Sequence, residues 1–327
     1  MNLNSVDKKI LWALHNNSRL PVSKVAKKCR ISREIAEYRI KKLEKTGIIK
    51  GFVARVDMSF LCAGVGSALF KLIRFDEKRL SGILDFLKAH RSVNWIAELC
   101  GTADIVIVFL YKSSEDLAQI ITEISEFIGS NLKEHQIQLY ISEYKFSREG
   151  LVAEDARKFI SPLISFKDHS EKKDLDKIDK LLLGILANNC RIKNIELAKK
   201  LKISEDAVRR RIISLEKRGL LLGYSITIDV NKLGFESYYV QLQIDQMTNQ
   251  TIAKIKYYCE TSPYVTYCSR IAGRYNVVMT VCAKNRNHFN DLLRDLRKHF
   301  GAQLLDYDFQ IDLEEHKETT LPEGFLD

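Results

Sequence analysis

The most informative hydrophobic pattern in the chain lies between residues 204 and 219. Val208, Ile212 and Leu215 recur at helical spacing and form one narrow apolar stripe. Ser204 stands before this run as an N-cap and Gly219 follows it, so the pattern predicts one short helix. A helix that is buried along one edge and cationic on the other suits the DNA major groove, although a solvated charged face is the alternative. At 100° per residue, the face opposite the stripe carries Asp206, Arg210, Ile213, Ser214 and Lys217, with Arg209 beside it.

The same helix occurs a second time, because the chain matches itself at a shift of 172 residues. Between 3–51 and 175–223, 20 of 49 positions are identical without a gap. In the earlier copy Ser32 caps the helix and Gly47 ends it. The period is too long for a solenoid, so it indicates a duplicated module that covers roughly 3–143 and 175–315. The earlier helix buries Ala36, Ile40 and Leu43, and its outer face carries Glu34, Tyr38, Lys41, Lys42 and Lys45.

Each copy begins with a head of three short helices. The first helix has an apolar face made of Val6, Ile10, Leu11 and Leu14, and a second short helix covers about 22–29. Three helices that end in this order predict a helix-turn-helix. A strand-like stretch at 48–56 follows and is expected to act as a wing or as a hinge ribbon.

Each head is followed by a tail that reads strand, helix, strand, strand, helix, strand. This order predicts a split βαβ, ferredoxin-like domain, and the face of its sheet without helix cover needs a partner sheet. The predicted elements are about 66–74, 77–90, 93–100, 104–111, 114–128 and 136–143, then 237–245, 249–261, 264–272, 275–283, 286–299 and 304–312.

The predicted fold class is therefore α+β, with two repeats, each a winged helix-turn-helix head followed by a βαββαβ ferredoxin-like domain. The link carries Phe159, Ile160, Leu163, Ile164 and Phe166, so part of it is expected to dock on a domain. The expected boundaries are 1–56 and 57–145 for the first head and tail, 146–174 for the linker, 175–229 and 230–315 for the second head and tail, and 316–327 for a terminal tail.

The charge of the chain is concentrated in the heads. The whole chain carries +10, whereas residues 3–51 hold 13 basic and 4 acidic residues and residues 175–223 hold 12 and 6. The heads thus carry +9 and +6, which leaves −5 for the remainder. Positive charge concentrated in the heads is expected for a protein whose partner is double-stranded DNA. It argues against a basic protein that binds polyanions non-specifically over its whole surface.

Other functional classes receive less support from the composition. The seven cysteines are scattered and form no Cys-x-x-Cys pair, which favours free thiols in a reducing cytoplasm over disulfides or a zinc site. No run of 18 apolar residues and no signal-peptide core occurs, so we expect a cytoplasmic protein with no membrane partner. We expect no cofactor and no metal.

The turn between the second and third strands of each tail is a candidate effector site. It contains Gly101 and Asp104 in the first copy and Gly273 and Asn276 in the second. Backbone amides and one polar side chain meet there, which suits a ligand carboxylate or amine. The alternative is a tight turn in which glycine supplies a positive φ.

These residues resemble the Lrp/AsnC family of archaeal and bacterial transcription regulators. The resemblance rests on Asp7-Lys8-Lys9-Ile10-Leu11, on the run from Arg39 to Phe52, on its second copy from Arg211 to Tyr224, and on the two glycine turns. It covers nearly the whole chain and implies a winged helix-turn-helix, a ferredoxin-like effector domain, pairing through those sheets, and often an amino-acid effector. Because two units share one chain, the resemblance implies either an intramolecular pseudo-dimer or a homo-oligomer through the sheets.

Two other functions stay open. The sirohaem decarboxylases are similar in sequence and are built from paired units of this kind, and Tyr275-Asn276 with Arg270 nearby matches part of their pattern. The same pattern in those enzymes also contains a histidine and a Trp-Phe pair. Both are missing from this chain, so we expect a protein that is not an enzyme. The third interpretation is an effector-sensing scaffold whose heads do not bind DNA. The favoured interpretation is a tandem transcription regulator. In this interpretation Arg39 and Arg211 tie the third helix to a glutamate of their own copy or to the neighbouring strand. The expected DNA-contacting residues are Tyr38, Lys41, Lys42, Lys45, Arg209, Arg210, Ser214 and Lys217.

Overall fold

The computed structural model describes residues 3–73, 76–152 and 175–325. The main helices and strands of the second half begin and end 172 residues after their counterparts in the first half. The sequence repeat is therefore also a repeat of structure. The first unit consists of α1 (Ser5–Asn16), α2 (Val22–Cys29), α3 (Arg33–Lys45), β1 (Ile49–Val56), β2 (Gly64–Leu72), α4 (Glu77–Ala89), β3 (Val93–Cys100), β4 (Ile105–Tyr111), α5 (Ser114–Ile128), β5 (Leu132–Phe146) and the short α6 (Glu149–Val152).

The second unit repeats this order, and a 3-10 helix at Glu323–Phe325 stands where the first unit has α6. Its elements are α7 (Lys177–Asn188), α8 (Asn194–Leu201), α9 (Glu205–Lys217), β6 (Leu221–Ile228), β7 (Glu236–Ile244), α10 (Asn249–Thr261), β8 (Val265–Ala272), β9 (Val277–Ala283), α11 (Arg286–Phe300) and β10 (Leu304–Glu318).

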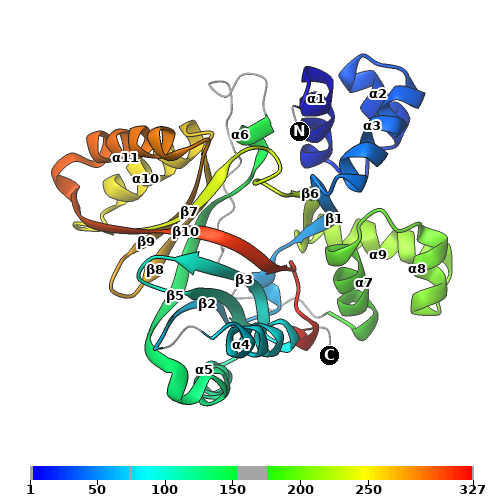
Figure 1. Cartoon of the computed structure of the whole chain (residues 1–327). Helices are drawn as coiled ribbons and strands as arrows, with labels where there is room; N and C mark the ends of the chain where they lie inside the picture. Colours follow the sequence, from blue (N-terminus) through cyan, green and yellow to red (C-terminus); the bar gives the residue numbers. More distant parts are fainter. Residues whose placement is uncertain (1–2, 74–75, 153–174, 326–327) are drawn as a thin grey trace.

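The two heads share one ribbon and one core. β1 pairs antiparallel with β6, so the stretch predicted as a wing or a hinge ribbon is a ribbon between the heads. A single cluster of buried side chains joins both heads through this ribbon, and it includes Leu11 and Leu14 from α1 and Leu183 and Leu186 from α7. The two heads are therefore packed as one body on one side of the molecule (Figure 1).

The two tails close into one sheet. Among the described residues, eight strands run in the order β10-β3-β4-β2-β5-β8-β9-β7 and return to β10. The two seams between the units are β5 with β8 and β10 with β3, and both start from the same register: Leu139 faces Ala272, and Ile311 faces Cys100. Each unit thus supplies the partner sheet that the other unit needs.

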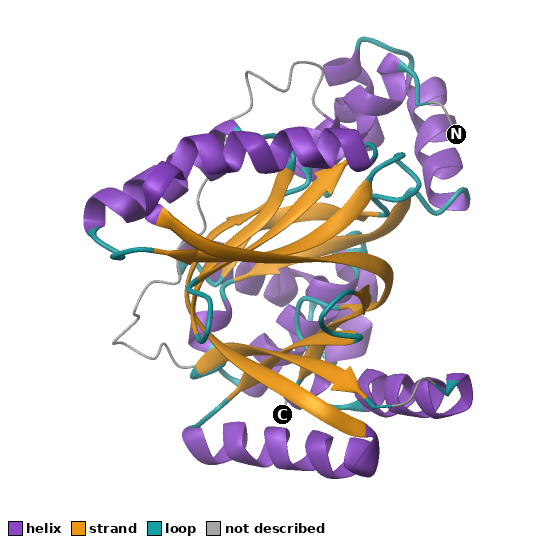
Figure 2. Ribbon diagram, turned by 60° about the vertical axis from the view of Figure 1, so that its left-hand side comes forward, coloured by secondary structure: helices purple, strands orange, loops and turns teal. Residues whose placement is uncertain are grey.

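Helices cover the outside of the closed sheet, and side chains fill its inside. α4 and α5 pack on the first unit and α10 and α11 on the second, as two helical layers outside the strands (Figure 2). The interior of the sheet holds its own cluster, in which Leu69, Leu99 and Ile271 lie among Tyr239 and Tyr275. The α+β class and the ferredoxin-like tails predicted from the sequence are confirmed.

Some predicted boundaries differ from the observed elements. β5 runs over Leu132–Phe146 instead of 136–143, and β10 continues to Glu318, beyond the expected end of the second tail at 315. Both strands are longer at their C-terminal ends because those ends pair with the other unit, which a local pattern does not report, whereas the first residues of β5 pair with β2 of their own unit. The apolar linker residues Phe159 to Phe166 lie outside the described residues.

Candidate functional site

The two candidate recognition helices are built alike. Ser32 and Ser204 cap α3 and α9, and each hydroxyl accepts a hydrogen bond from the amide three residues further on, at 3.3 and 3.2 Å. The residues that end α2 and α8, Arg30 and Lys202, have φ angles of 56° and 54°, which turns the chain sharply into the next helix. This is the turn of the predicted helix-turn-helix, and it fixes the angle between the last two helices of each head.

The outer faces of α3 and α9 are open to solvent. Tyr38 is 63% exposed, and Arg210 makes no ion pair with any residue that the structure describes. Lys41 donates to Glu37 at 2.9 Å on the surface of α3, so its charge is already partly balanced. Of the eight predicted DNA-contacting residues, Lys42 is half-buried and the other seven are exposed: Tyr38, Lys41, Lys45, Arg209, Arg210, Ser214 and Lys217.

The two arginines on the inner side of these helices are anchors. Arg39 contacts Asp7 of α1 at 3.3 Å, and Arg211 contacts Asp179 of α7 at 2.7 Å. The sequence predicts a structural role for both arginines, with a glutamate of the same copy or the neighbouring strand as the partner. The partner is instead an aspartate in the first turn of the first helix, so each arginine sets the position of the recognition helix against its own head.

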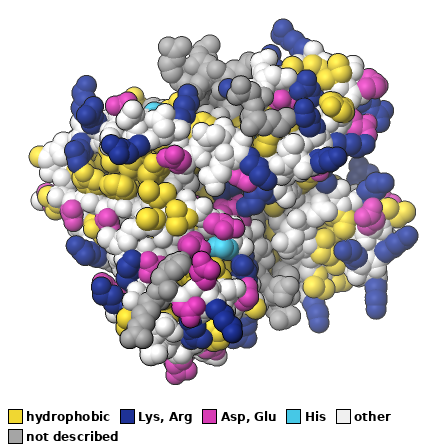
Figure 3. Space-filling model, in the orientation of Figure 1, with side chains coloured by type: hydrophobic (Ala, Val, Ile, Leu, Met, Phe, Trp, Pro, Cys, Tyr) yellow, Lys and Arg dark blue, Asp and Glu magenta, His cyan; other side chains and the backbone are white. Residues whose placement is uncertain are grey.

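Reciprocal contacts hold each head against the strand of the other head. The Ser18 amide donates to the Tyr224 carbonyl at 3.2 Å, and the Cys190 amide donates to the Phe52 carbonyl at 2.8 Å. Next to the second of these hydrogen bonds, the Cζ atom of the Arg191 guanidinium lies 4.0 Å from the centre of the Phe52 ring. These contacts are related by the 172-residue shift, so the heads form a pseudo-two-fold pair. Lys and Arg side chains project from the outer edges of this pair in Figure 3.

The two glycine turns hold strand ends together. The Asp104 carboxylate accepts from the Leu72 amide at 2.7 Å and from the Lys71 ammonium at 2.7 Å. In the second unit the Asn276 side chain accepts from the Ile244 amide at 2.9 Å and donates to the carbonyl of the same residue at 2.6 Å. Both polar side chains are thus engaged with their own unit. Gly101 lies against Gln310 of the other unit, and Gly273 lies above Gln138.

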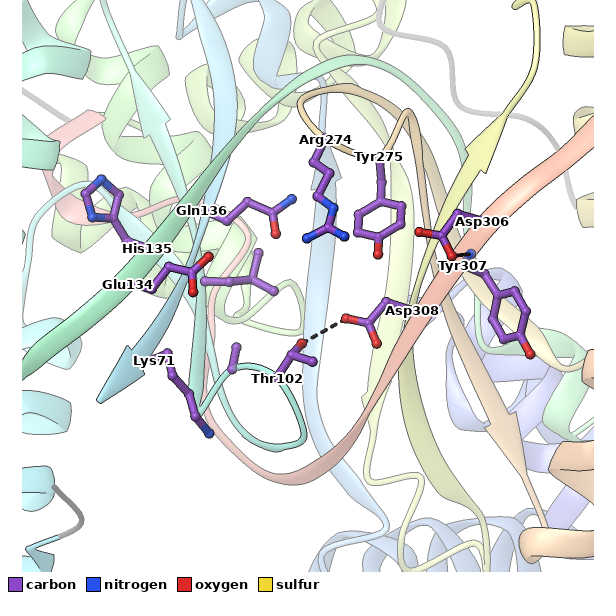
Figure 4. A pocket seen from close by; sticks show the side chains of 12 residues that line it. Lys71, Thr102, Glu134, His135, Gln136, Arg274, Tyr275, Asp306, Tyr307 and Asp308 are labelled. Carbon is purple, nitrogen blue, oxygen red and sulfur yellow. Dashed lines mark hydrogen bonds between the residues drawn. The ribbon is translucent and has the colours of Figure 1, made fainter. Parts of the chain in front are cut away.

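A cavity of about 430 Å³ opens where these turns meet the closed sheet. Its walls are pseudo-symmetric, because most lining residues come in pairs 172 residues apart, such as Thr102 with Arg274 and Gln136 with Asp308. The cavity therefore lies between the two units and belongs to both (Figure 4). The lining residues are Leu69, Lys71, Thr102, Ala103, Glu134, His135, Gln136, Arg274, Tyr275, Asp306, Tyr307 and Asp308.

The chemistry of this cavity is not symmetric. The Arg274 guanidinium points between Gln136 and Tyr275, while Asp306 and Asp308 project from the opposite wall (Figure 4). Thr102 donates to Asp308 at 2.8 Å, and no described cation forms an ion pair with either aspartate. Buried amide atoms of Gln136, Gln138 and Gln310 also lack a hydrogen-bond partner within the described part of the chain. Of these three glutamines only Gln136 lines the cavity, which thus offers the Arg274 cation, the Glu134, Asp306 and Asp308 carboxylates and one amide to a small polar ligand.

Comparison with known proteins agrees with this architecture. A model of winged helix-turn-helix DNA-binding domains matches residues 3–50, a model of the AsnC-type helix-turn-helix domain matches 175–216, and a model of the Lrp/AsnC ligand-binding domain matches 237–322. The chain thus contains helix-turn-helix and ligand-binding domains of the Lrp/AsnC type. The resemblance seen in the sequence is confirmed, and the family has both archaeal and bacterial members among the relatives.

Two Lrp/AsnC relatives show how much of the chain such matches cover. LrpA, a helix-turn-helix transcriptional regulator of Pyrococcus horikoshii, is 48% identical over 61 residues, which is 19% of this chain and 43% of LrpA. LrpC, a regulator of Bacillus subtilis, is 29% identical over 120 residues, which is 36% of this chain and 81% of LrpC. Each relative thus aligns with at most about one unit of this Lrp/AsnC protein.

A solved structure resembles the whole molecule. The crystal structure of the siroheme decarboxylase NirDL covers 99% of this chain and 96% of its own, with a TM-score of 0.65 at 17% identity. The prediction that this Lrp/AsnC protein is not an enzyme is therefore wrong as it stands, because an enzyme has the same two-unit architecture. At 17% identity the likeness concerns the fold, which is compatible with both regulators and enzymes.

The structure also identifies residues that sequence reasoning missed. Arg148 follows β5 and contacts Glu315 at 3.3 Å and Glu318 at 3.0 Å on β10, while it donates to the Ile228 carbonyl at the end of the ribbon at 3.1 Å. Lys50 of β1 pairs with Glu315 as well. Although burial alone would raise the pKa of Glu315, Arg148 and Lys50 hold it at about 2. This junction joins the heads to the tails of the Lrp/AsnC fold.

No described helix is long and apolar enough to cross a bilayer. Within the same residues, no group of three or more histidine, cysteine, aspartate or glutamate side chains is arranged to hold a metal ion. All seven cysteines are free thiols.

Proposed function

We propose that this Lrp/AsnC protein is a sequence-specific transcription regulator that acts in the cytoplasm and places α3 and α9 in the major groove of double-stranded DNA. The observation that supports the proposal is the pair of recognition helices on one ribbon. Each helix is anchored by an inner arginine and exposes a polar, cationic outer face, which suits a base-reading helix.

The exposed side chains suggest how the contacts divide. Arg210, with no ion pair among the described residues, has the geometry to bind a guanine through two hydrogen bonds. Lys45 and Lys217 stand in the last turn of the two helices and are proposed to contact phosphates. Tyr38, Lys41, Lys42, Arg209 and Ser214 complete the proposed interface.

Fluorescence anisotropy with DNA from the protein's own upstream region, against random duplex, tests this proposal. We expect preference for the upstream DNA and a steep loss of affinity with salt. Arg210→Ala should cost about 1–3 kcal/mol of specific binding. Arg294→Ala serves as the control, because Arg294 is an exposed arginine on α11, and its loss should leave binding unchanged. Equal affinity for both duplexes, or an unchanged Arg210→Ala variant, would contradict the proposal.

We infer that an effector of this regulator binds in the cavity between the units. The turns with Gly101, Asp104, Gly273 and Asn276 are proposed as the frame of that site, and Thr102, Arg274 and Tyr275 reach from them into the cavity. A ligand with a carboxylate for Arg274 and an ammonium group for Asp306 or Asp308, such as an amino acid, would complement these charges.

Calorimetry with the twenty amino acids tests the effector site. We expect heat with at least one of them, and loss of that heat in Arg274→Gln. Arg294→Gln on the outer helix α11 is the matched control and should bind as the parent does. If no amino acid gives heat or a thermal shift, the two glycine turns are structural turns only.

Decarboxylation of a tetrapyrrole is a second candidate, favoured by the whole-length likeness to siroheme decarboxylase NirDL. One structure of that protein contains an iron-uroporphyrin III analogue. Such a ligand carries several carboxylates, which in the cavity would be repelled by the like-charged Glu134, Asp306 and Asp308. Absorbance titration with iron-uroporphyrin III, followed by mass analysis of the products, tests this function; a shifted absorbance band together with loss of CO2 would support the enzyme.

A further inference from the structure

The two recognition helices occupy equivalent positions in a pseudo-symmetric frame. β1 and β6 pair antiparallel, and the contacts of each head with the other head's strand repeat at the 172-residue shift. α3 and α9 lie on either side of this ribbon, on the side of the heads turned away from the closed sheet (Figure 1). A pair related in this way presents its helices to one duplex as an inverted pair, in the manner of a dimeric helix-turn-helix protein.

The inner faces of the two helices are nearly the same. Arg39 and Arg211 are both bound to an aspartate of the first helix, and the apolar stripe repeats at Ile40 and Ile212. The buried pair Leu43 with Leu215 is identical as well. Packing therefore holds both helices in the same pose, and any difference in recognition must come from the outer face.

The outer faces have different chemistry. Tyr38 in α3 stands where α9 has Arg210, and Glu37 stands where α9 has Arg209. In α3 the Glu37 carboxylate binds Lys41, whereas the equivalent of Lys41 in α9 is Ile213, which is 41% exposed. Lys42 corresponds to Ser214, and among the eight proposed DNA-contacting residues only Lys45 and Lys217 form an identical pair.

These differences imply different base preferences. An arginine binds guanine through two hydrogen bonds, and an exposed isoleucine packs against a thymine methyl group. A tyrosine offers one hydroxyl and an aromatic face, and the Glu37–Lys41 pair offers a carboxylate that accepts from a cytosine amino group. Two identical half-sites would therefore satisfy one helix and mismatch the other.

We propose that this protein recognises a non-palindromic DNA site made of two unlike half-sites in inverted orientation, and binds it in one direction only. Half-site B, read by α9, contains guanine opposite Arg210, and half-site A, read by α3, does not depend on an arginine–guanine contact. This inference rests on the proposed DNA-binding function. It differs from the expectation for a symmetric homodimer, whose operator mirrors its own two-fold symmetry.

Selection of duplexes from a random pool with the full chain gives the preferred site, and three duplexes then test its symmetry. We expect the A–B duplex to bind at least about tenfold more tightly than the A–A and B–B palindromes, because each mismatched helix loses base contacts. A palindrome that binds as tightly as A–B would overturn the inference but leave the DNA-binding function intact. A selection without any preferred sequence would overturn the proposed function itself.

Point variants assign the half-sites to the helices. Arg210→Ala should relax base preference only in half-site B, and Tyr38→Ala only in half-site A. Lys45→Ala and Lys217→Ala are the matched control pair, since these lysines are identical and exposed, and should weaken binding to all duplexes and reduce the salt slope. Loss of preference in both half-sites from either single variant would contradict the assignment.

Transfer of the α9 surface to α3 gives the strongest test. The quadruple variant Glu37→Arg, Tyr38→Arg, Lys41→Ile and Lys42→Ser changes only outer-face residues, so the buried stripe of α3 stays as it is. We expect this variant to bind the B–B palindrome as tightly as the parent binds A–B. An unchanged preference for A–B, in a variant whose circular dichroism and melting match those of the parent, would overturn the inference.

Discussion

At the scale of single residues, carboxylates near the junction of heads and tails make stability depend on pH. Burial raises the pKa of Glu143 to about 8, although Arg55 lowers it, and Asp57 raises it further. Asp312 is raised to about 7 by burial and by Glu315. Both groups therefore favour the protonated form in the folded protein, which is the opposite of the paired Glu315.

The sign of this pH dependence can be tested at Glu143. A carboxyl whose pKa rises from 4.5 to about 8 on folding contributes stability that is present below pH 4.5 and lost as the pH rises through 8. Glu143→Gln should remove this loss of stability. The free energy of unfolding should then fall with pH only by the smaller amount that Asp312 contributes. Urea unfolding at several pH values between about 5 and 9 measures it. Glu134→Gln, at an exposed carboxylate on the same strand, should keep the parent slope; an equally steep Glu143→Gln profile would contradict the assignment.

A second residue-scale prediction separates structure from ligand binding at the first turn. Asp104→Ala leaves the Leu72 amide without its partner and removes one of the two hydrogen bonds of the Lys71 ammonium, so we expect a loss of about 1–3 kcal/mol in the free energy of unfolding. Asp104→Asn should lose less, because Asn276 makes the equivalent backbone contacts in the second unit. Asp85→Ala on the surface of α4 is the control. Unchanged stability in Asp104→Ala, with loss of effector binding, would instead favour a direct ligand contact.

At the scale of elements, local patterns predicted the heads better than the site between the units. α3 spans Arg33–Lys45 because Ser32 caps it and Gly47 follows it, and both signals are local. β10 was expected to end at 312 but continues to Glu318, because its last residues pair with β3 of the other unit. Asp308 and Gln136 lie in different units and line one cavity only after the sheet has closed. The periodicity of a strand reports its buried face but not which strand lies beside it.

The pseudo-symmetry of the turns gives an element-scale prediction with an internal control. At Gly101 the φ angle is 155°, and an added Cβ would lie 2.7 Å from the Cγ of the buried Gln310. At the equivalent Gly273 the nearest atom would lie at 3.5 Å. We therefore expect Gly101→Ala to cost about 1–3 kcal/mol of stability and Gly273→Ala to cost clearly less. Thermal and urea unfolding of the two variants measure the difference; equal costs would contradict the close contact between this turn and β10.

At the scale of the whole molecule, the heads should behave as one cooperative body. Their buried side chains form a single cluster across the β1–β6 ribbon, and each head is hydrogen-bonded to the strand of the other. The tails have separate clusters under their own helices. A defect in one head therefore has a direct physical route into the other head, through the shared ribbon, and a weaker one into the helical layers of the tails.

Hydrogen exchange measured by mass spectrometry tests this cooperativity. Leu183 of α7 is fully buried, and Leu183→Ala should cost about 2–5 kcal/mol locally. Because the ribbon is shared, we expect faster exchange in α3 and β1 as well as in α9 and β6. Ile83→Ala, at an equally buried site on the inner face of α4, is the control and should speed exchange in the first tail while α3 keeps its protection. If Leu183→Ala speeds exchange only within residues 175–228, the heads open independently, and DNA binding by one head would then not order the other.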